Sequence, residues 1–414
     1  MTSNFVTRFQ ALDQLLNETR QYWQLLAFDH LCTPWPELDA YLTGLSDLNL
    51  SALDMDQSAL QHALANYIPQ LNEISALIAV DTVGSRRPTL PFWLSNGIKG
   101  RKVNQLQDFV GALNEQHLPV LEWCAGKGHL GRILAFTGVP HVDSVELQAH
   151  LCTQGAHSAQ QQGLAMTFHC ADVLQDPVAH YFKPQQHAVA LHACGQLHQN
   201  FMTEAAKAGC EKISLSPCCY HLFTPAQYAP MSEVAKRSQI TLTHNDMKLA
   251  LQETVTAPSR VAKVRKKEVL WRLAFDAIRR DVTGSDKYIS VPSVNKAIFS
   301  GEFKAFCAWA AEQKGVRLPA YIDYAAYLEA ARQRQQITER IELVRHAFRR
   351  AIEMWLVLDR ALYLQEFGYE VALTQFCEKS LTPRNLLIQA AKQKHSVGEE
   401  NVSTGEESSS ASAE

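Results

Sequence analysis

The sequence predicts an α/β fold: a Rossmann-like parallel sheet with an N-terminal helical region and a helical insertion before the last hairpin. Three observations support this prediction. Short apolar runs typical of buried strands alternate with helical periodicity from residue 118 to about 225, a glycine-rich turn follows the first run, and two late runs suit a β-hairpin. The 414 residues suffice for one large domain with an insertion, or for two domains.

Composition excludes several other classes of protein. Hydrophobic residues make up 46% and charged residues 20%, as in ordinary globular proteins. Lys and Arg number 39 against 42 Asp and Glu, so the whole chain is not a basic protein that coats nucleic acid. The ten cysteines are scattered, no export signal is recognisable, and no apolar stretch approaches the roughly 18 to 20 residues of a membrane span. We therefore expect a cytoplasmic protein without a membrane segment.

Each element follows from its local pattern. Apolar side chains at helical spacing from residue 5 to about 80 indicate an N-terminal helical region, which we place at 1–90. The core, in which strands and helices alternate, is placed at 98–225. Its strands are expected over 119–124, 141–146, 166–170, 188–192 and 212–216, with helices from about 130, over 150–162 and over 197–208. Strand and helix in alternation predict a parallel sheet whose ligands bind at the carboxyl ends of the strands.

Helical periodicity returns after about residue 225. We assign 226–340 to a helical insertion and 341–395 to a final helix and a β-hairpin that completes the sheet. Five parallel strands closed by a late antiparallel hairpin are the arrangement of class I methyltransferases. The Ser- and Glu-rich stretch 396–414 is expected to be disordered.

A glycine-rich loop joins the first strand to its helix. Gly126 and Gly128 allow the backbone to turn tightly and to approach a ligand, while Gly131 lets the helix pack close to the sheet. Cys124 stands where many methyltransferases have a further glycine. The same glycine spacing also occurs in nicotinamide and flavin dehydrogenases, so the loop alone does not identify the ligand.

Three acidic residues favour S-adenosylmethionine over a dinucleotide. Glu122 ends the first strand, where a carboxylate can pair with the ammonium group of the methionine moiety. Glu146 ends the second strand and can accept hydrogen bonds from both ribose hydroxyls, and Asp172 follows the third strand, within reach of an adenine amino group. We therefore predict an adenosyl cofactor at the carboxyl ends of these strands.

The fourth and fifth strands end in residues that carry chemistry. Because these carboxyl ends are neighbours in a doubly wound sheet, their side chains should converge beside the methyl donor. The candidate catalytic residues are His192, Cys194, Cys218, Cys219, Tyr220 and His221.

Several motifs together resemble a known family. The runs E-W-C-A-G-K-G-H-L-G, L-H-A-C-G, S-P-C-C-Y-H, L-D-R-A-L-Y-L-Q-E-F-G-Y and T-P-R-N resemble methyltransferase-like protein 25 and the methyltransferase domain of glutathione S-transferase C-terminal domain-containing protein. The L-H-A-C-G and C-C-Y-H runs are also similar to the eukaryotic tRNA 2′-O-methyltransferase of the acceptor stem. The resemblance implies S-adenosylmethionine as the cofactor. The cofactor-binding residues expected from the resemblance and the loop are Lys102, Gln105, Glu122, Cys124, Gly126, Gly128, Glu146, Asp172, Val173 and His192.

Four interpretations stay open for the cysteine and histidine cluster. The side chains could be small wall residues of a pocket, ligands of a Zn²⁺ ion, a Cys218 nucleophile that attacks cytosine C6, or a general base at His192 or His221. Adjacent cysteines do not easily bind one tetrahedral ion together, and no CxxC pair is present, so we assign no metal ligand.

Two basic stretches suggest a partner. Residues 260–280 carry eight cations against two acids, and 332–350 carry six arginines. Arg384, in the expected hairpin turn, is a further cation at the same rim. These stretches suit an RNA phosphate track, although a solvated helix face would look alike. The sequence therefore predicts a methyltransferase of RNA, either tRNA or rRNA, with a protein methyltransferase or a non-catalytic S-adenosylmethionine-binding interaction protein as alternatives.

Overall fold

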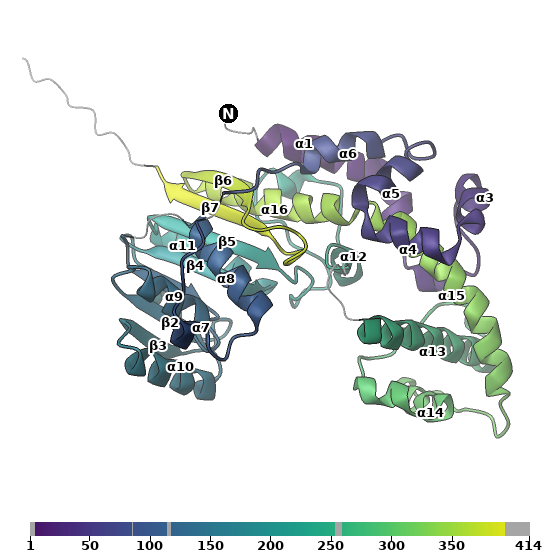
Figure 1. Ribbon diagram of the computed structural model, residues 1–414. Helices are drawn as coiled ribbons and strands as arrows, with labels where there is room; N and C mark the ends of the chain where they lie inside the picture. Colours follow the sequence, from purple (N-terminus) through teal and green to yellow (C-terminus); the bar gives the residue numbers. More distant parts are fainter. Residues whose placement is uncertain (1–4, 85, 114–116, 253–258, 394–414) are drawn as a thin grey trace, which may run out of the picture.

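A seven-stranded sheet lies at the centre of the protein (Figure 1). The computed structural model describes residues 5–84, 86–113, 117–252 and 259–393, so the predicted tail 396–414 lies outside the described residues. The strands are β1 (Val120–Trp123), β2 (Val142–Glu146), β3 (Met166–Cys170), β4 (His187–Cys194), β5 (Lys212–Cys218), β6 (Tyr369–Gln375) and β7 (Leu386–Lys392). Their order is β3-β2-β1-β4-β5-β7-β6. The predicted fold class is confirmed.

The first five strands are parallel, and β7 lies antiparallel between β5 and β6. The strand order reverses at β1, which pairs with β2 on one side and β4 on the other. Such a reversal opens a crevice at the carboxyl ends of the strands, where open α/β sheets bind their ligands. All four residues of β1 are buried, as expected for a strand covered on both faces.

Helices connect the parallel strands, with one exception. The helices beside the sheet are α7 (Phe92–Ser95), α8 (Gly100–Ala112), α9 (His129–Phe136), α10 (Ala149–Gln161) and α11 (Gln196–Ala208). Between β3 and β4, however, the chain forms only the single 3₁₀ turn η2 (Ala179–Tyr181). The regular alternation expected from the sequence is therefore wrong at this one connection.

The N-terminal helices share a core with the sheet. They are α1 (Phe5–Glu18), α2 (Arg20–Trp23), η1 (Ala27–Asp29), α3 (Pro36–Gly44), α4 (Asp47–Met55), α5 (Gln57–Leu64) and α6 (Leu71–Ile78). Helices α1 and α6 lie along α16 (Arg349–Glu366), next to the β6–β7 hairpin (Figure 1). One apolar cluster includes Phe9 of α1, Trp355 of α16 and Leu121 of β1. The sheet and the N-terminal helices are therefore held together by continuous apolar packing.

The insertion has a core of its own. Its elements are η3 (Ala235–Arg237), α12 (His244–Leu249), α13 (Ser259–Thr283), η4 (Lys296–Ser300), α14 (Phe303–Lys314) and α15 (Tyr324–His346). Helices α13 and α14 stand apart from the sheet and pack through Trp271, Phe275 and Phe306. Helix α15 runs from them back to α2 and α4. Within the described part of the chain, no helix has both the length and the apolar composition of a membrane span.

A buried polar network ties α16 to the loops after β4 and β5. Arg360 is fully buried, and its Nε donates to His198 Nε2 over 2.8 Å, while the Nδ1 of His198 lies 3.0 Å from the Ala193 carbonyl oxygen. The guanidinium also lies over the rings of Tyr220 and Tyr228, at 5.1 and 5.5 Å from their centroids. One side chain thus contacts both α11, which follows β4, and the chain that follows β5.

The neighbouring Asp359 completes this network. It is fully buried and accepts hydrogen bonds from the Tyr228 hydroxyl, from the Met231 backbone N–H and from both the N–H and the hydroxyl of Ser232. The Tyr228 hydroxyl in turn accepts from Arg360 Nη1. A buried charge is tolerated when hydrogen bonds replace its hydration. Asp359 meets this condition with both carboxylate oxygens, and Arg360 meets it through Nε and Nη1.

We expect Arg360→Met to lower the free energy of unfolding by about 3 to 5 kcal/mol, because the substitution leaves the buried acceptors of His198 and Tyr228 without their charged donor. Urea denaturation measures the effect. Arg332→Met, which alters an exposed arginine of α15, is the control and should change stability by no more than about 0.5 kcal/mol. A loss below about 1 kcal/mol for Arg360→Met would contradict the role of the network.

Candidate functional site

The loop between β1 and α9 has the backbone that a bound ligand requires. Cys124 adopts φ 57°, Gly126 φ 60° and Gly128 φ 65°. Cys124 thus takes up the left-handed conformation that a glycine adopts without strain, at the position where many methyltransferases have one. A Cβ built on Gly126 would meet no atom within 4 Å, whereas one on Gly131 would lie 2.5 Å from Glu122 Oε2. Gly126 therefore borders open space, and Gly131 allows the close approach of helix and strand.

Glu146 lies at the end of β2 beside this loop. Its Oε2 accepts a hydrogen bond from the Gly126 N–H over 2.9 Å, and its Oε1 accepts one from the Gln148 N–H over 3.0 Å. Two backbone donors therefore hold the carboxylate in one orientation. A carboxylate oxygen accepts more than one hydrogen bond, so capacity for ribose hydroxyls remains.

Asp172 and Val173 follow β3. The Asp172 carboxylate accepts from the Leu174 N–H and so stabilises a local turn, and the side chain is half-buried. The Val173 side chain belongs to the apolar core, and its carbonyl oxygen accepts from the Asn200 amide. The Val173 side chain is therefore turned into the core, and only its backbone is left at the end of the sheet for the predicted contact with a cofactor.

The position of Glu122 differs from the expectation. Its side chain is 3% exposed and accepts hydrogen bonds from the Ser144 hydroxyl at 2.8 Å and from the Gly131 N–H. Burial raises the pKa of Glu122 to about 7. The carboxyl group thus joins β1, β2 and α9 beneath the loop, and the structure gives it no open side from which to pair with an ammonium group.

Helix α8 brings Lys102 and Gln105 to the same edge of the sheet. Gln105 Oε1 lies 3.2 Å from His192 Nε2, which joins α8 to the end of β4. His192 has φ 70°, a rare conformation for a residue with a side chain, and its ring reaches the solvent. The surrounding protein, followed by the positive charge of Lys102, lowers the pKa of His192 below its usual value. At neutral pH the imidazole is therefore uncharged and able to accept a proton.

Three of the predicted cysteines converge. The sulfur atoms of Cys194, Cys218 and Cys219 all lie within 4.8 Å of one another, and Cys194 Sγ is 3.6 Å from Cys218 Sγ. Arg384, at the turn before β7, lies close enough for its charge to act on the thiols of Cys194 and Cys219. Cys124 is half-buried in the first loop, and burial raises the pKa of its thiol to about 12, so it stays a thiol.

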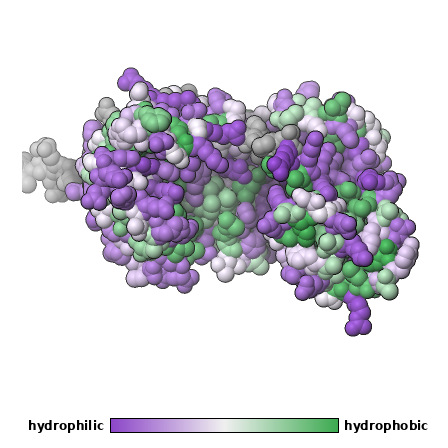
Figure 2. Space-filling model, turned by 60° about the horizontal axis from the view of Figure 1, so that its bottom comes forward, coloured by the Kyte–Doolittle hydropathy of each residue, from purple (hydrophilic) through white to green (hydrophobic). Residues whose placement is uncertain are grey.

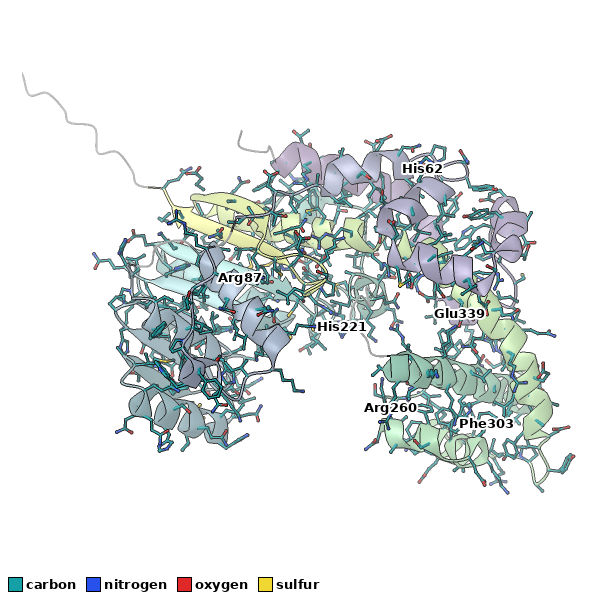
Figure 3. All side chains as sticks on the ribbon, viewed as in Figure 1. His62, Arg87, His221, Arg260, Phe303 and Glu339 are labelled. Carbon is teal, nitrogen blue, oxygen red and sulfur yellow. The ribbon has the colours of Figure 1, made fainter. Side chains whose placement is uncertain are left out.

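The residues after Cys219 divide between the core and the surface. Tyr220 is 1% exposed, and its hydroxyl donates to Glu353 Oε1 and to the Pro217 carbonyl oxygen. The predicted catalytic role of Tyr220 is therefore wrong, since the side chain points into the core. His221 is half-buried, and Figure 3 shows it on the side of the sheet domain that faces α13.

Gly195 is a residue of this site that sequence reasoning left without a role. It has φ 56°, and a Cβ there would lie 2.0 Å from the Leu222 carbonyl oxygen. The Gln196 N–H donates to that same oxygen over 2.7 Å. The glycine thus lets the loop of residues 219–222 lie directly on the start of α11. The glycine that ends the L-H-A-C-G run is the sequence feature that could have indicated this role.

The two basic stretches have different surroundings. On α13, the side chains of Arg260, Lys263, Arg265 and Lys266 are exposed and form no ion pair within 4 Å with any described residue. The later cations of that stretch are paired: Arg272 with Glu268, and both Arg279 and Arg280 with the buried Asp276.

The second stretch, 332–350, is not a cationic surface, which corrects the expectation. Arg332 is exposed, but the other five arginines bind acceptors of the protein itself. Four of them form ion pairs: Arg334 with Asp276, Arg345 with Glu342, Arg349 with Asp54 and Arg350 with Glu353. Arg340 donates to the carbonyl oxygens of Leu42 and Leu45 at the end of α3. These arginines hold α15 and α16 against their neighbours.

A hollow separates the sheet from helices α13 and α14. Figure 2 shows it between the two halves of the molecule, with hydrophobic side chains at its floor. His221 and Arg260 come from opposite sides of this hollow (Figure 3). A separate cavity of about 840 Å³ lies at the other edge of the sheet, where His187 and Lys212 begin β4 and β5. The candidate site is at the hollow, because the predicted residues converge there.

Comparison with known proteins agrees with this geometry. Residues 99–226 match the family model of a methyltransferase domain, and S-adenosylmethionine is the cofactor that this domain implies. No match was found among curated proteins.

Solved structures similar to the chain include proteins described as methyltransferases. A tRNA (uracil-54, C5)-methyltransferase of Pyrococcus abyssi in complex with S-adenosyl-L-homocysteine is 17% identical over 27% of this chain and 27% of that chain, with a TM-score of 0.23. TrmN from Thermus thermophilus is 17% identical over 33% of this chain and 46% of that chain, with a TM-score of 0.27. The chain thus covers less than half of either protein.

The residues at the carboxyl edge fit the implied cofactor. Gly126 borders open space, and the fixed Glu146 carboxylate lies next to it with acceptor capacity to spare. Asp172 is accessible at the end of the neighbouring strand. Glu146 and Asp172 are therefore the residues of this chain that would hold the ribose and the adenine.

The burial of Glu122 predicts a pH dependence of stability. Its pKa is raised from 4.5 to about 7 in the folded protein, so the folded state binds the proton more tightly than the unfolded state. The free energy of unfolding should therefore fall by about 3 kcal/mol as the pH rises from 4.5 through 7. Glu122→Gln, which cannot ionise, should remove this fall in urea denaturation, whereas Glu370→Gln on the exposed face of β6 should preserve it. An unchanged pH profile in Glu122→Gln would show that the carboxyl group is not the cause.

Proposed function

We propose that the chain is an S-adenosylmethionine-dependent methyltransferase that acts on RNA, either tRNA or rRNA. The observation that carries this proposal is the distribution of exposed cations. They lie at the start of α8, within the matched methyltransferase domain, and at the start of α13, the helix on the other side of the hollow (Figure 1).

On the sheet side, the start of α8 carries the exposed side chains of Lys99, Arg101 and Lys102. Lys102 acts electrostatically on His192, which places this cationic turn at the site itself. On the opposite side, the first turns of α13 carry the four exposed cations from Arg260 to Lys266. Unpaired cations attract phosphates because binding releases the counterions that surround a polynucleotide. A strand that follows the hollow would contact both groups.

The cofactor supplies an activated methyl group. The chain has to hold the acceptor in line with that group and to remove the proton of the acceptor. Gln105 fixes the ring of His192, and burial, together with the nearby positive charge of Lys102, lowers the pKa of the imidazole. His192 is thus suited to take a proton from a hydroxyl or an amino group, and Arg384 is suited to hold a phosphate beside it.

Glu146→Ala tests the cofactor site. The variant loses the carboxylate that would accept from both ribose hydroxyls, at about 1.5 kcal/mol or more for each charged hydrogen bond. We expect the affinity for S-adenosylmethionine in calorimetry to fall by about a hundredfold or more. Glu370→Ala, an exposed carboxylate of β6, should bind as the unaltered protein does. Unchanged affinity in Glu146→Ala would refute this cofactor site.

Transfer of tritiated methyl groups tests the acceptor class. The protein is incubated with labelled S-adenosylmethionine and with total RNA or total protein from cells that lack it. We expect label in RNA. Label in protein alone would favour a protein methyltransferase, and label in neither, with cofactor affinity intact, would favour a non-catalytic binding protein.

Charge reversal on α13 tests the phosphate track. The triple variant Arg260→Glu, Lys263→Glu, Lys266→Glu should bind RNA at least about tenfold more weakly at low salt. Its affinity should also depend less steeply on salt concentration. The matched control reverses three exposed cations elsewhere, Lys207, Lys236 and Arg332. Equal losses in the two triple variants would mean that net charge, rather than this surface, governs binding.

A further inference from the structure

We infer that Cys194, Cys218 and Cys219 form a binding site for a thiophilic divalent cation, with Zn²⁺ as the expected ion. Their three sulfur atoms come from the ends of two neighbouring strands and lie within 4.8 Å of one another. Tetrahedral coordination with Zn–S bonds of about 2.3 Å separates the sulfurs by about 3.8 Å. The 3.6 Å between Cys194 Sγ and Cys218 Sγ is close to this spacing.

Adjacent cysteines ordinarily oppose such a site, because successive side chains of an extended strand point to opposite faces. This chain breaks the alternation at Cys219, where φ is 47°. The left-handed turn directs the side chain of Cys219 to the same side as that of Cys218. The objection that the sequence raises against a metal therefore does not apply to the folded protein.

A second distortion directs Cys194 toward the pair. The register between β4 and β5 shifts between Leu191 and Cys194, and His192 within this bulge has φ 70°. Residues with side chains in the left-handed region cost on the order of 1 to 3 kcal/mol each and concentrate at functional sites. Two such residues, His192 within β4 and Cys219 directly after β5, lie where the three thiols come together.

Charge and access also suit a bound cation. Three thiolates and one divalent ion carry a net negative charge, and Arg384 lies near enough to act on Cys194 and Cys219. Cys194 and Cys219 are partly exposed, so an ion has a path from the solvent. Three thiolates leave one tetrahedral position for a further ligand. His221 is a candidate for this position, because its Nδ1 atom is buried and without a hydrogen-bond partner among the described residues.

The alternative is a cluster of thiols that only lines the pocket. The metal site and the thiol lining predict different properties of the purified protein. A metal site holds close to one equivalent of zinc after purification under reducing conditions, and it protects three thiols from alkylation until a chelator is added. A thiol lining holds no metal, and a chelator does not change its reactivity.

The experiment measures zinc by mass spectrometry in the full chain and in the variants Cys194→Ser, Cys218→Ser and Cys219→Ser. Each variant should retain less than about a tenth of the zinc. Cys307→Ser, which alters a buried cysteine of α14, is the control and should retain all of it. Retention of zinc in all three site variants, or its absence from the unaltered protein together with a failure to take up added zinc, would overturn the proposal.

Cobalt substitution keeps the test independent of variants that fail to fold. Co²⁺ added to the chelator-treated, unaltered chain should give the thiolate-to-cobalt charge-transfer absorption and the visible bands of a tetrahedral site. Absence of the charge-transfer band would contradict thiolate ligation. Calorimetry with S-adenosylmethionine on the same sample separates this result from the cofactor assignment. The metal site is inferred from the positions of three sulfur atoms, so either binding can fail while the other persists.

Discussion

The buried residues Asp359 and Arg360, which meet at the Tyr228 hydroxyl, are the constraint on which the arrangement of the site depends. Arg360 contacts His198 and two tyrosines, and through His198 it reaches the carbonyl group of Ala193, between His192 and Cys194. Asp359 holds the chain that follows the fifth strand. Since both residues lie on α16, the packing of this one helix holds the segments at the carboxyl edge in their observed positions. The C-terminal hairpin therefore completes the sheet and the site together.

Backbone strain is concentrated at the same edge. Among the described residues, those with a side chain and positive φ are Cys124, His192 and Cys219, and each follows or interrupts a different strand end. Such conformations persist only where surrounding contacts impose them. The Gln105–His192 contact and the Arg360 network supply contacts of this kind. The strained positions also carry the imidazole and one thiol of the candidate site, so the strain serves to aim functional groups.

Cations in this protein divide between holding the fold and facing the hollow. Asp276 alone receives Arg279, Arg280 and Arg334, which joins both basic stretches of the sequence inside the helical insertion. A count of charges along the chain cannot separate such arginines from the exposed ones at the start of α13. Acidic partners that are far away in the sequence decide which cations remain for a ligand. Arg349 and its partner Asp54, for example, are 295 residues apart.

The sequence alone determined the strands, the helices α9, α10 and α11 that follow β1, β2 and β4, the hairpin and the close packing at Gly131, because periodicity and glycine spacing are local properties. It also placed Glu146 at the end of β2. It did not predict α7 and α8. Only the tertiary structure decided which side chains face the site. It buried Tyr220 against Glu353, enclosed Glu122 between Ser144 and Gly131, and paired most arginines of 332–350. It also brought three thiols together through two left-handed residues. These outcomes depend on contacts between distant segments and on rare backbone conformations, which local patterns do not encode.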